Sequence, residues 1–112
     1  MRSRLYLVLL VCAASFSAGA RAAGPGVSSS DMGVTVYMAS WCPACRSLER
    51  ELKDRRIPFG EIDVDTNPRA FERARAATGE SVIPQTSVET GKGVRWIVGA
   101  DADAVERAYR NR

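Results

Sequence analysis

Two cysteines, Cys42 and Cys45, lie where the chain passes from an expected strand into an expected helix, and this placement restricts the folds open to it. Before them, Val34–Met38 is a short run of β-branched, aromatic and apolar residues, which predicts a buried strand. After Cys42, Pro43 suits the first position of a helix, because its missing N–H needs no partner there. Apolar residues then recur at spacings of three and four through Ala44–Arg56, which predicts an amphipathic helix. Cys42 should therefore precede the first helical turn, with Cys45 inside it.

The rest of the chain continues this alternation of strands and helices. The expected strands are Val34–Met38, Phe59–Val64, Gln85–Glu89 and Val94–Val98, and the expected helices are 44–56, 68–78 and Ala102–Arg110. Thr66 or Asn67 caps the second helix and Gly79 stops it. The order β-α-β-α-β-β-α makes the first two strands parallel and the last two an antiparallel hairpin. We expect an α/β fold with a four-stranded mixed sheet flanked by helices on both faces.

Residue spacing also predicts how two of the helices present their side chains. Opposite charges four residues apart should line the outer side of the first helix, in the pairs Glu49 with Lys53, Arg50 with Asp54, and Glu51 with Arg55. The second helix should pack through an apolar stripe of Phe71, Ala74 and Ala77.

The first 22 residues have the features of a secretory signal peptide. Arg2 and Arg4 precede an apolar run, Leu5–Phe16, and a candidate cleavage site follows at Ala20-Arg21-Ala22, with Ala18-Gly19-Ala20 as a second candidate. An uncleaved membrane anchor is the alternative, but the run is shorter than the roughly 18–20 apolar residues that spanning requires. We therefore expect three regions: a signal peptide at 1–22, a flexible leader at 23–32 and one folded domain at 33–112.

The charge of the chain depends on this segment. The 112 residues include 16 Lys and Arg against 13 Asp and Glu. Three of the basic residues, Arg2, Arg4 and Arg21, belong to the expected signal peptide, and their removal leaves 13 basic and 13 acidic residues. This balance predicts no nucleic-acid partner. Cys12 also leaves, so the exported protein keeps two cysteines in a compartment where disulfides persist, which we expect to be a bacterial periplasm.

Three roles are open to the cysteine pair: metal ligation, a structural cross-link and redox exchange. A structural zinc site needs four ligands, and the exported chain offers two cysteines and no histidine, so we expect no metal. A structural disulfide that closes so short a loop removes little entropy from the unfolded chain. A C-x-x-C pair beside a β-α-β pattern is typical of redox-active sites. Redox exchange is therefore the favoured role.

The two cysteines should divide the redox chemistry between them. Unpaired N–H groups at the start of the helix, together with the helix dipole, favour negative charge on Cys42, and the thiolate is the attacking form. Cys45 lies a turn further in, on the apolar face, and should be more buried. We expect Cys42 to attack a substrate disulfide and Cys45 to resolve the mixed disulfide that forms.

Three motifs give the chain a resemblance to the glutaredoxins, a branch of the thioredoxin superfamily. Cys42-Pro43-Ala44-Cys45 matches C-P-x-C, Val82-Ile83-Pro84 matches T-V-P, and Val98-Gly99-Ala100-Asp101 is similar to the G-G-x-x-D segment. The resemblance covers roughly Val34–Tyr109 and implies a redox-active disulfide between Cys42 and Cys45. It also implies a cis peptide bond before Pro84, next to that disulfide. The Ile83 backbone would then pair with a peptide or with glutathione.

The substrate or glutathione contacts implied by the resemblance are Trp41, Pro43, Ile83, Pro84, Gly99 and Asp101. Three family contacts to glutathione differ, because the usual lysine is Ala39, the motif aromatic is Ala44 and the first glycine is Val98. Trp41 resembles the W-C of thioredoxins and should form an apolar wall beside the disulfide for peptide substrates. Val36 stands where thioredoxins place a buried acid.

Together these features predict an exported thiol–disulfide oxidoreductase. We expect a monomer that acts on protein or small-molecule thiols and disulfides and meets a membrane only through its signal peptide. No bound cofactor is expected, and glutathione is a candidate co-substrate. The alternative is a non-catalytic redox-sensing or binding module on the same fold.

Overall fold

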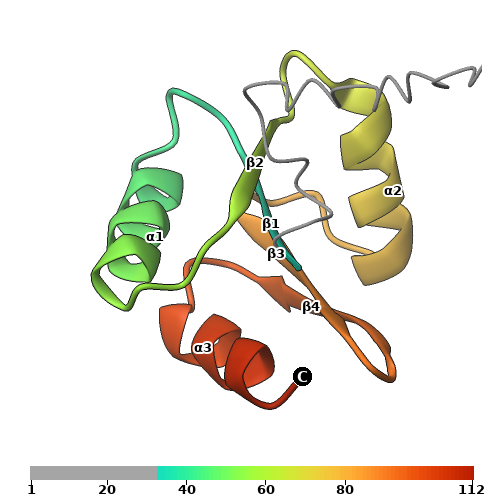
Figure 1. Ribbon diagram of the computed structural model, residues 1–112. Helices are drawn as coiled ribbons and strands as arrows, with labels where there is room; N and C mark the ends of the chain where they lie inside the picture. The colour runs from blue at the N-terminus through green and yellow to red at the C-terminus, as the bar shows by residue number, and fades with distance from the viewer. Residues whose placement is uncertain (1–32) are drawn as a thin grey trace, which may run out of the picture.

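The computed structural model describes residues 33–112, and the expected signal peptide and leader lie outside them. Seven elements follow one another: β1 (Val34–Met38), α1 (Pro43–Asp54), β2 (Gly60–Asp63), α2 (Pro68–Thr78), β3 (Gln85–Thr90), β4 (Gly93–Val98) and α3 (Ala102–Arg110) (Figure 1). The predicted α/β class and element order are confirmed. Within this described part of the chain, no helix is both long and apolar enough to cross a membrane.

The four strands form one mixed sheet in the order β2-β1-β3-β4. β1 and β2 are parallel, with Tyr37 opposite Ile62, because α1 crosses over between them. β3 is antiparallel to β1, with Tyr37 opposite Gln85, and β4 returns antiparallel to β3. The end of β1 therefore lies beside the start of β3. This pairing brings the segments that contain Cys42 and Pro84 to the same end of the sheet.

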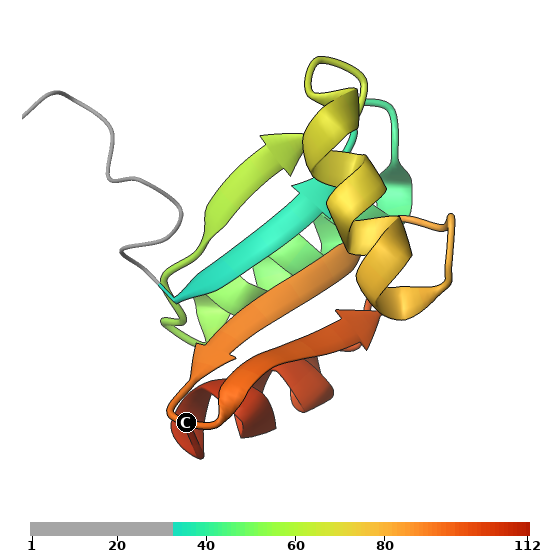
Figure 2. The same ribbon diagram turned by 90° about the vertical axis from the view of Figure 1, so that its right-hand side faces the viewer.

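Helices cover both faces of the sheet, with α2 on one face and α1 and α3 on the other (Figure 2). The larger core lies beneath α1 and α3 and consists of Val34, Val36, Leu48, Leu52, Ile57, Val88, Ile97, Ala102, Val105 and Ala108. The smaller core joins Tyr37 to Ala70 and Ala74 of α2, and the Trp96 ring centroid lies 5.5 Å from that of Tyr37. Val36 and Tyr37 thus serve opposite faces, because successive side chains of a strand alternate.

α1 ends at Asp54, two residues before the predicted end at Arg56. Arg56 has a φ of 56°, in the left-handed region, and the following amide, that of Ile57, donates to the Leu52 carbonyl at 2.9 Å. This turn satisfies a carbonyl at the end of the helix and sends Ile57 into the core.

Two other predictions were wrong in part. β2 is limited to Gly60–Asp63, shorter at both ends than predicted; these residues are in register with β1, and after them the Val64 amide still donates to the Met38 carbonyl at 2.9 Å. In α2, Ala74 of the predicted stripe is buried, but Ala77 is exposed and Ala70 is buried instead. Ala70 and Ala74 carry the apolar packing of α2 on the smaller core, and the last turn of the helix meets the sheet through the Thr78 hydroxyl, which donates to Gln85 of β3.

Arg55 joins α1 to α3. Its Nη1 donates to Asp103 at 2.7 Å and to Glu106 at 2.8 Å, and its Nη2 lies 3.6 Å from Glu51. Glu106 also accepts from Nε of Arg110 at 2.8 Å. Of the three charge pairs predicted along α1, residues 33–112 form only the one between Glu51 and Arg55. The ion pairs of this helix therefore serve mainly its packing against α3.

Glu106 should stabilise the fold only while it is ionised. Hydrogen bonds from Arg110 and then from Arg55 lower the pKa of Glu106 below its ordinary value of 4.5. A carboxyl with a lowered pKa in the folded state contributes stability above its ordinary pKa, and this contribution is lost as the pH falls through the folded-state pKa. Glu106→Gln should therefore lower stability at neutral pH and flatten its decline below about pH 5. Urea midpoints measured across that range test this, and a decline as steep as that of wild type would contradict it.

Candidate active site

The cysteines lie in the loop and the first helical turn that follow β1. The Cys42 amide donates to the Ala39 carbonyl at 3.1 Å, which turns the chain directly after the strand. Pro43 begins α1, and a disulfide joins Cys42 to Cys45, whose Cα atoms are 5.3 Å apart. The cysteine pair thus lies at the junction of strand and helix.

Cys42 is the N-cap residue of α1. Its Sγ accepts the backbone N–H of Cys45 at 3.2 Å, the place that a Ser or Asp oxygen takes in most helix caps. No acidic side chain lies in the first turn of α1 to oppose negative charge there. This N–H and the positive end of the helix dipole would therefore stabilise an anionic sulfur at Cys42 once the disulfide is reduced.

The disulfide is enclosed by apolar side chains. Cys45 is fully buried, and Cys42 keeps an exposed fraction of 4%. The residues that surround the two cysteines are Met38, Ala39, Val64 and Ile83. The accessible part of the disulfide therefore belongs to Cys42.

The segment before β3 lies against this disulfide. The Ile83–Pro84 peptide bond is cis, as the resemblance implies, and the Ile83 side chain packs on the cysteine cluster. Pro84 is buried, and its carbonyl accepts the Gly99 amide at 2.8 Å. Among residues 33–112, neither the N–H nor the C=O of Ile83 has a hydrogen-bond partner. These two groups are free to bond to a peptide backbone.

The remaining predicted contacts fall at two helix starts. Pro43 is exposed at the start of α1. Asp101 caps α3, where its Oδ1 accepts the Ala104 N–H at 2.9 Å. Gly99, with a φ of 91°, makes the left-handed turn between β4 and α3 that favours glycine. The Gly99 amide donates to the Pro84 carbonyl, and this hydrogen bond holds Gly99 beside the Ile83–Pro84 segment of the site.

Gln85 is a residue of the site that no motif in the sequence predicted. It is fully buried, and its Nε2 donates to the carbonyls of Glu80 at 2.9 Å and Val82 at 3.0 Å. Its Oε1 accepts the Thr78 hydroxyl at 2.9 Å. One amide therefore ties the end of α2 to the loop that leads into Pro84. The signal in the sequence was a polar residue at the start of an otherwise buried strand.

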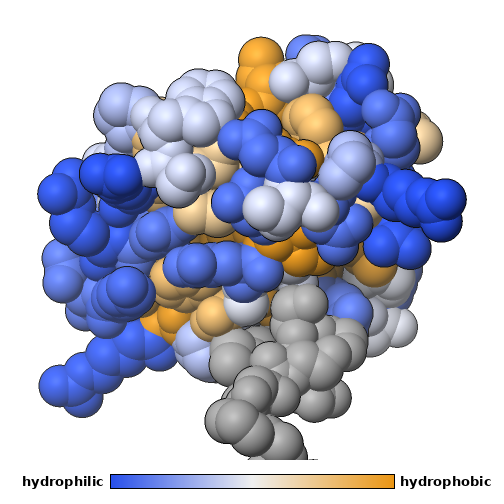
Figure 3. Space-filling model, turned by 90° about the horizontal axis from the view of Figure 1, so that it is seen from above, coloured by the Kyte–Doolittle hydropathy of each residue, from blue (hydrophilic) through white to orange (hydrophobic). Residues whose placement is uncertain are grey.

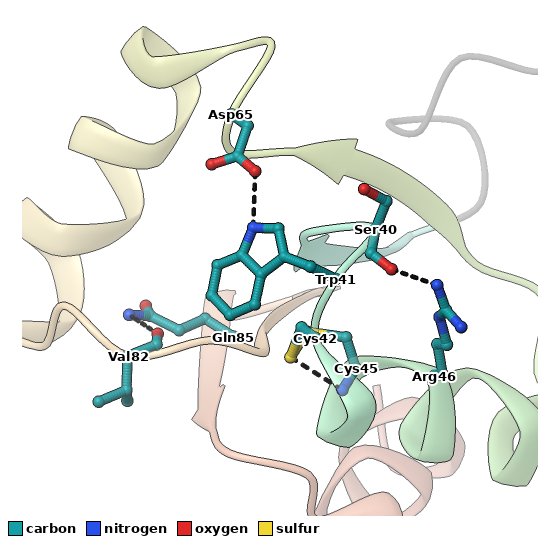
Figure 4. Close-up of a disulfide and its surroundings, with 8 residues drawn as sticks. All are labelled: Ser40, Trp41, Cys42, Cys45, Arg46, Asp65, Val82 and Gln85. Atoms are coloured by element: carbon teal, nitrogen blue, oxygen red, sulfur yellow. Dashed lines mark hydrogen bonds between the residues drawn. A yellow bond between two sulfur atoms is a disulfide. The ribbon is translucent and has the colours of Figure 1, made fainter.

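Trp41 lies beside the disulfide with its ring largely in solvent (Figure 4). The side chain is 66% exposed, and its Nε1 donates to Oδ2 of Asp65, from the loop after β2, at 2.8 Å. On the other side of the cysteines, the Arg46 guanidinium donates to the Ser40 carbonyl. Asp65 was not anticipated from the sequence, and it fixes the direction of the indole ring next to Cys42.

Apolar residues reach the surface at this end of the molecule. Val82 is 53% exposed and Val98 is 39% exposed, next to the Ile83–Pro84 and Gly99 segments respectively. Seen from above, hydrophobic surface runs between more hydrophilic flanks (Figure 3). A cavity of about 610 Å³ lies elsewhere, between the β3–β4 turn and the end of α3, and none of the predicted site residues lines it. Residues 33–112 hold no cluster of three or more side chains suited to bind a metal.

Comparison with known proteins gives consistent matches. Residues 34–92 match the family model described as Glutaredoxin. Mycoredoxin 1 of Corynebacterium glutamicum is 34% identical over 59 residues, which are 52% of this chain and 72% of that protein. The glutaredoxin-like NrdH-redoxin of Escherichia coli is 27% identical with a TM-score of 0.57, over 66% of this chain and 91% of that chain. A glutaredoxin of Archaeoglobus fulgidus, at 20% identity and a TM-score of 0.59, shares the fold over 70% of this chain and 86% of its own.

The family match covers more than half of the chain, including the cysteine pair, the Ile83–Pro84 segment and the β3–β4 hairpin as far as Lys92. Members of this family exchange thiols and disulfides, and the chain carries a disulfide between Cys42 and Cys45 in the C-x-x-C motif. It is a thiol–disulfide oxidoreductase, and it belongs to the glutaredoxin family.

Proposed function

We propose that Cys42 is the attacking cysteine and that Cys45 resolves. The observation that carries this assignment is the hydrogen bond from the Cys45 N–H to Cys42 Sγ at the start of α1. The Cys42 thiolate attacks one sulfur of a substrate disulfide, forming a mixed disulfide and releasing the first substrate thiolate. Cys45 then attacks Cys42 Sγ and releases the second. The substrate gains two electrons, and the Cys42–Cys45 pair loses them.

We propose further that the preferred substrates are disulfides in peptides or proteins. The exposed Trp41 and Val82 offer apolar area beside the disulfide, and the free backbone groups of Ile83 can pair with an extended chain. NrdH-redoxin, a relative in structure and sequence, has a thioredoxin-like activity profile. Glutathione is the weaker candidate, because Ala39, Ala44 and Val98 replace three of the family's usual contacts. We expect no bound cofactor.

Two assays test the proposed function and its substrate preference. With a dithiol donor, the protein should reduce insulin with turnover. With glutathione, it should reduce hydroxyethyl disulfide more slowly. Turnover in neither assay would contradict the proposed function and favour a non-catalytic binding module. Faster turnover of hydroxyethyl disulfide would contradict the preference for protein disulfides.

The proposed cellular setting is outside the cytoplasm. Support comes from the signal-peptide pattern in residues 1–22, and export would place the two cysteines in a compartment where disulfides persist. N-terminal sequencing of protein recovered from a periplasmic fraction should begin at Ala23. Size-exclusion chromatography of that protein should show the expected monomer.

Asp65 should matter for substrate binding through Trp41. Asp65→Ala removes the acceptor of the indole N–H and leaves the ring free to rotate. Because a typical hydrogen bond contributes roughly 0.5–1.5 kcal/mol net, KM for insulin should rise by about two- to tenfold with little change in kcat. Steady-state kinetics and Trp41 fluorescence anisotropy measure this. Asp54→Ala, at the exposed end of α1, is the matched control. An unchanged KM in Asp65→Ala would show that the indole is held by other contacts.

A further inference from the structure

Glu49 carries a buried oxygen that has no partner. It lies in α1 one helical turn after Cys45. Its Oε1 is buried and accepts no hydrogen bond from any group in residues 33–112. An unsatisfied buried polar atom costs free energy, so such an atom in a native fold needs an explanation.

The basic residues near Glu49 do not pair with it. The Arg46 guanidinium is held by the Ser40 carbonyl, and Lys53 forms no ion pair with Glu49 within the described residues. The charge from another element that acts on the Glu49 carboxyl is that of Glu61 in β2, which is also acidic. Glu49 therefore faces the edge of the sheet without a compensating charge in contact.

Helix geometry directs the Glu49 side chain toward Cys45. Residues four apart lie on the same side of a helix, with their Cβ atoms about 5–6 Å apart. Side chains in a helix also lean toward its N-terminus, and the charge of Arg46, the residue after Cys45, acts on the Glu49 carboxyl, so this carboxyl is placed on the side of the turn that contains Cys45. Glu49 as a whole is only half-buried, which leaves a path from its carboxyl to solvent.

The surroundings of Glu49 suit a group that takes up a proton. Burial raises the pKa of Glu49 above its ordinary value of 4.5, and the negative charge of Glu61 raises it further. The positive charges of Lys53 and Arg46 act in the opposite direction and do not cancel the rise. A carboxyl with a raised pKa is a stronger base than one in water, which makes it better matched to accept a proton near neutral pH.

Cys45 needs such an acceptor. Its side chain is fully buried among apolar residues, an environment that disfavours the thiolate. The position that carries a buried acid in thioredoxins is Val36 here, and it lies in the apolar core. Without a base nearby, the thiol of Cys45 would have no route for its proton when it attacks.

We propose that Glu49 accepts the proton of Cys45 during resolution of the mixed disulfide. This inference rests on the proposed roles of the two cysteines. The proton passes from Cys45 Sγ to the Glu49 carboxylate as Cys45 Sγ forms its bond to Cys42 Sγ. The bond between Cys42 Sγ and the substrate sulfur breaks, and the substrate leaves as a thiolate that takes up a proton from solvent. Glu49 returns its own proton to solvent, so atoms, charge and electrons balance.

An aromatic disulfide with a coloured leaving thiol separates the two steps. Attack by Cys42 releases the first coloured thiolate, and resolution by Cys45 releases the second. In stopped-flow experiments on the reduced protein, Glu49→Gln should leave the first phase unchanged. It should slow the second phase on the order of 100-fold at neutral pH, the lower end of what general-base catalysis contributes. Glu49→Asp should restore part of the rate.

The pH dependence of the second phase gives a readout that a structural role would not change. In wild type this rate should fall as the pH drops through the pKa of Glu49, and Glu49→Gln should lose that inflection. Glu61→Gln should shift the inflection to lower pH and keep the maximal rate, because Glu61 raises the pKa of Glu49. Glu89→Gln, an exposed carboxyl in β3 away from Pro84, should match wild type.

The outcomes distinguish this inference from the proposed function. A second phase in Glu49→Gln with the rate and inflection of wild type would overturn the role of Glu49 and leave the cysteine roles intact. If wild type showed no first phase, or if that phase survived Cys42→Ser, the proposed function itself would fail.

Discussion

Cys42→Ser should abolish turnover of every disulfide substrate, whereas Cys45→Ser should trap a mixed disulfide. Serine at 42 can still cap α1, but its hydroxyl is not ionised near neutral pH and cannot attack sulfur. In Cys45→Ser, Cys42 Sγ still accepts the backbone N–H of residue 45, because the substitution changes only the side chain. The first attack therefore proceeds and the second does not.

Insulin reduction and intact-protein mass spectrometry measure these two effects. Cys42→Ser should fall to the background rate, a loss of several orders of magnitude. Cys45→Ser should gain the mass of one substrate thiol per molecule. The reverse pattern, with the adduct on Cys42→Ser through Cys45, would exchange the roles of the two cysteines.

Gln85→Met should destabilise the fold by about 2–4 kcal/mol and weaken substrate binding. Methionine has a similar length but donates no hydrogen bond, so the carbonyls of Glu80 and Val82 lose their partner. Each hydrogen bond lost contributes roughly 0.5–1.5 kcal/mol, and the Thr78 hydroxyl loses its acceptor as well, so three bonds are removed from around a fully buried side chain. Because those carbonyls shape the loop before Ile83, the surface that pairs with substrate should also loosen.

Urea denaturation gives the stability change, and steady-state kinetics give the functional one. KM for insulin should rise severalfold, while the rate at which iodoacetamide alkylates Cys42 should stay that of wild type, because the side-chain hydrogen bonds of Gln85 go to Thr78, Glu80 and Val82 and not to the cap of α1. Glu80→Gln, an exposed side chain in the same loop, should change stability by less than about 0.5 kcal/mol. A Gln85→Met protein as stable as this control would show that the hydrogen bonds of Gln85 contribute little.

Much of the fold could be predicted because its signals are local. Pro43, the apolar spacing of α1 and the short strand Val34–Met38 all act within one element, and each is where it was expected. The end of α1 was misplaced, because Arg56 has no residue-type signature of a left-handed turn. The exposure of Ala77 depends on how the last turn of α2 meets the sheet, where Thr78 makes the contact, and no property of the helix alone reports that.

The residues of the site also divide into those marked by local motifs and those placed by tertiary contacts. The disulfide between Cys42 and Cys45 and the cis bond before Pro84 follow from motifs, and both are present. Asp65 and Gln85 act across the chain, the first on Trp41 and the second on the loop before Ile83. Their roles depend on tertiary contacts, and neither position has a motif to mark it. The substrate roles predicted for six residues remain predictions: Trp41, Pro43, Ile83, Pro84, Gly99 and Asp101.

The most direct test is the ionisation of Cys42 in the reduced protein. The rate of alkylation by iodoacetamide as a function of pH, measured in Cys45→Ser so that one thiol reacts, reports the pKa of this sulfur. An N-cap sulfur that receives a backbone N–H should ionise below about pH 7, within the range of thiols at helix N-termini. A pKa near 8.5, about that of free cysteine, would contradict the account.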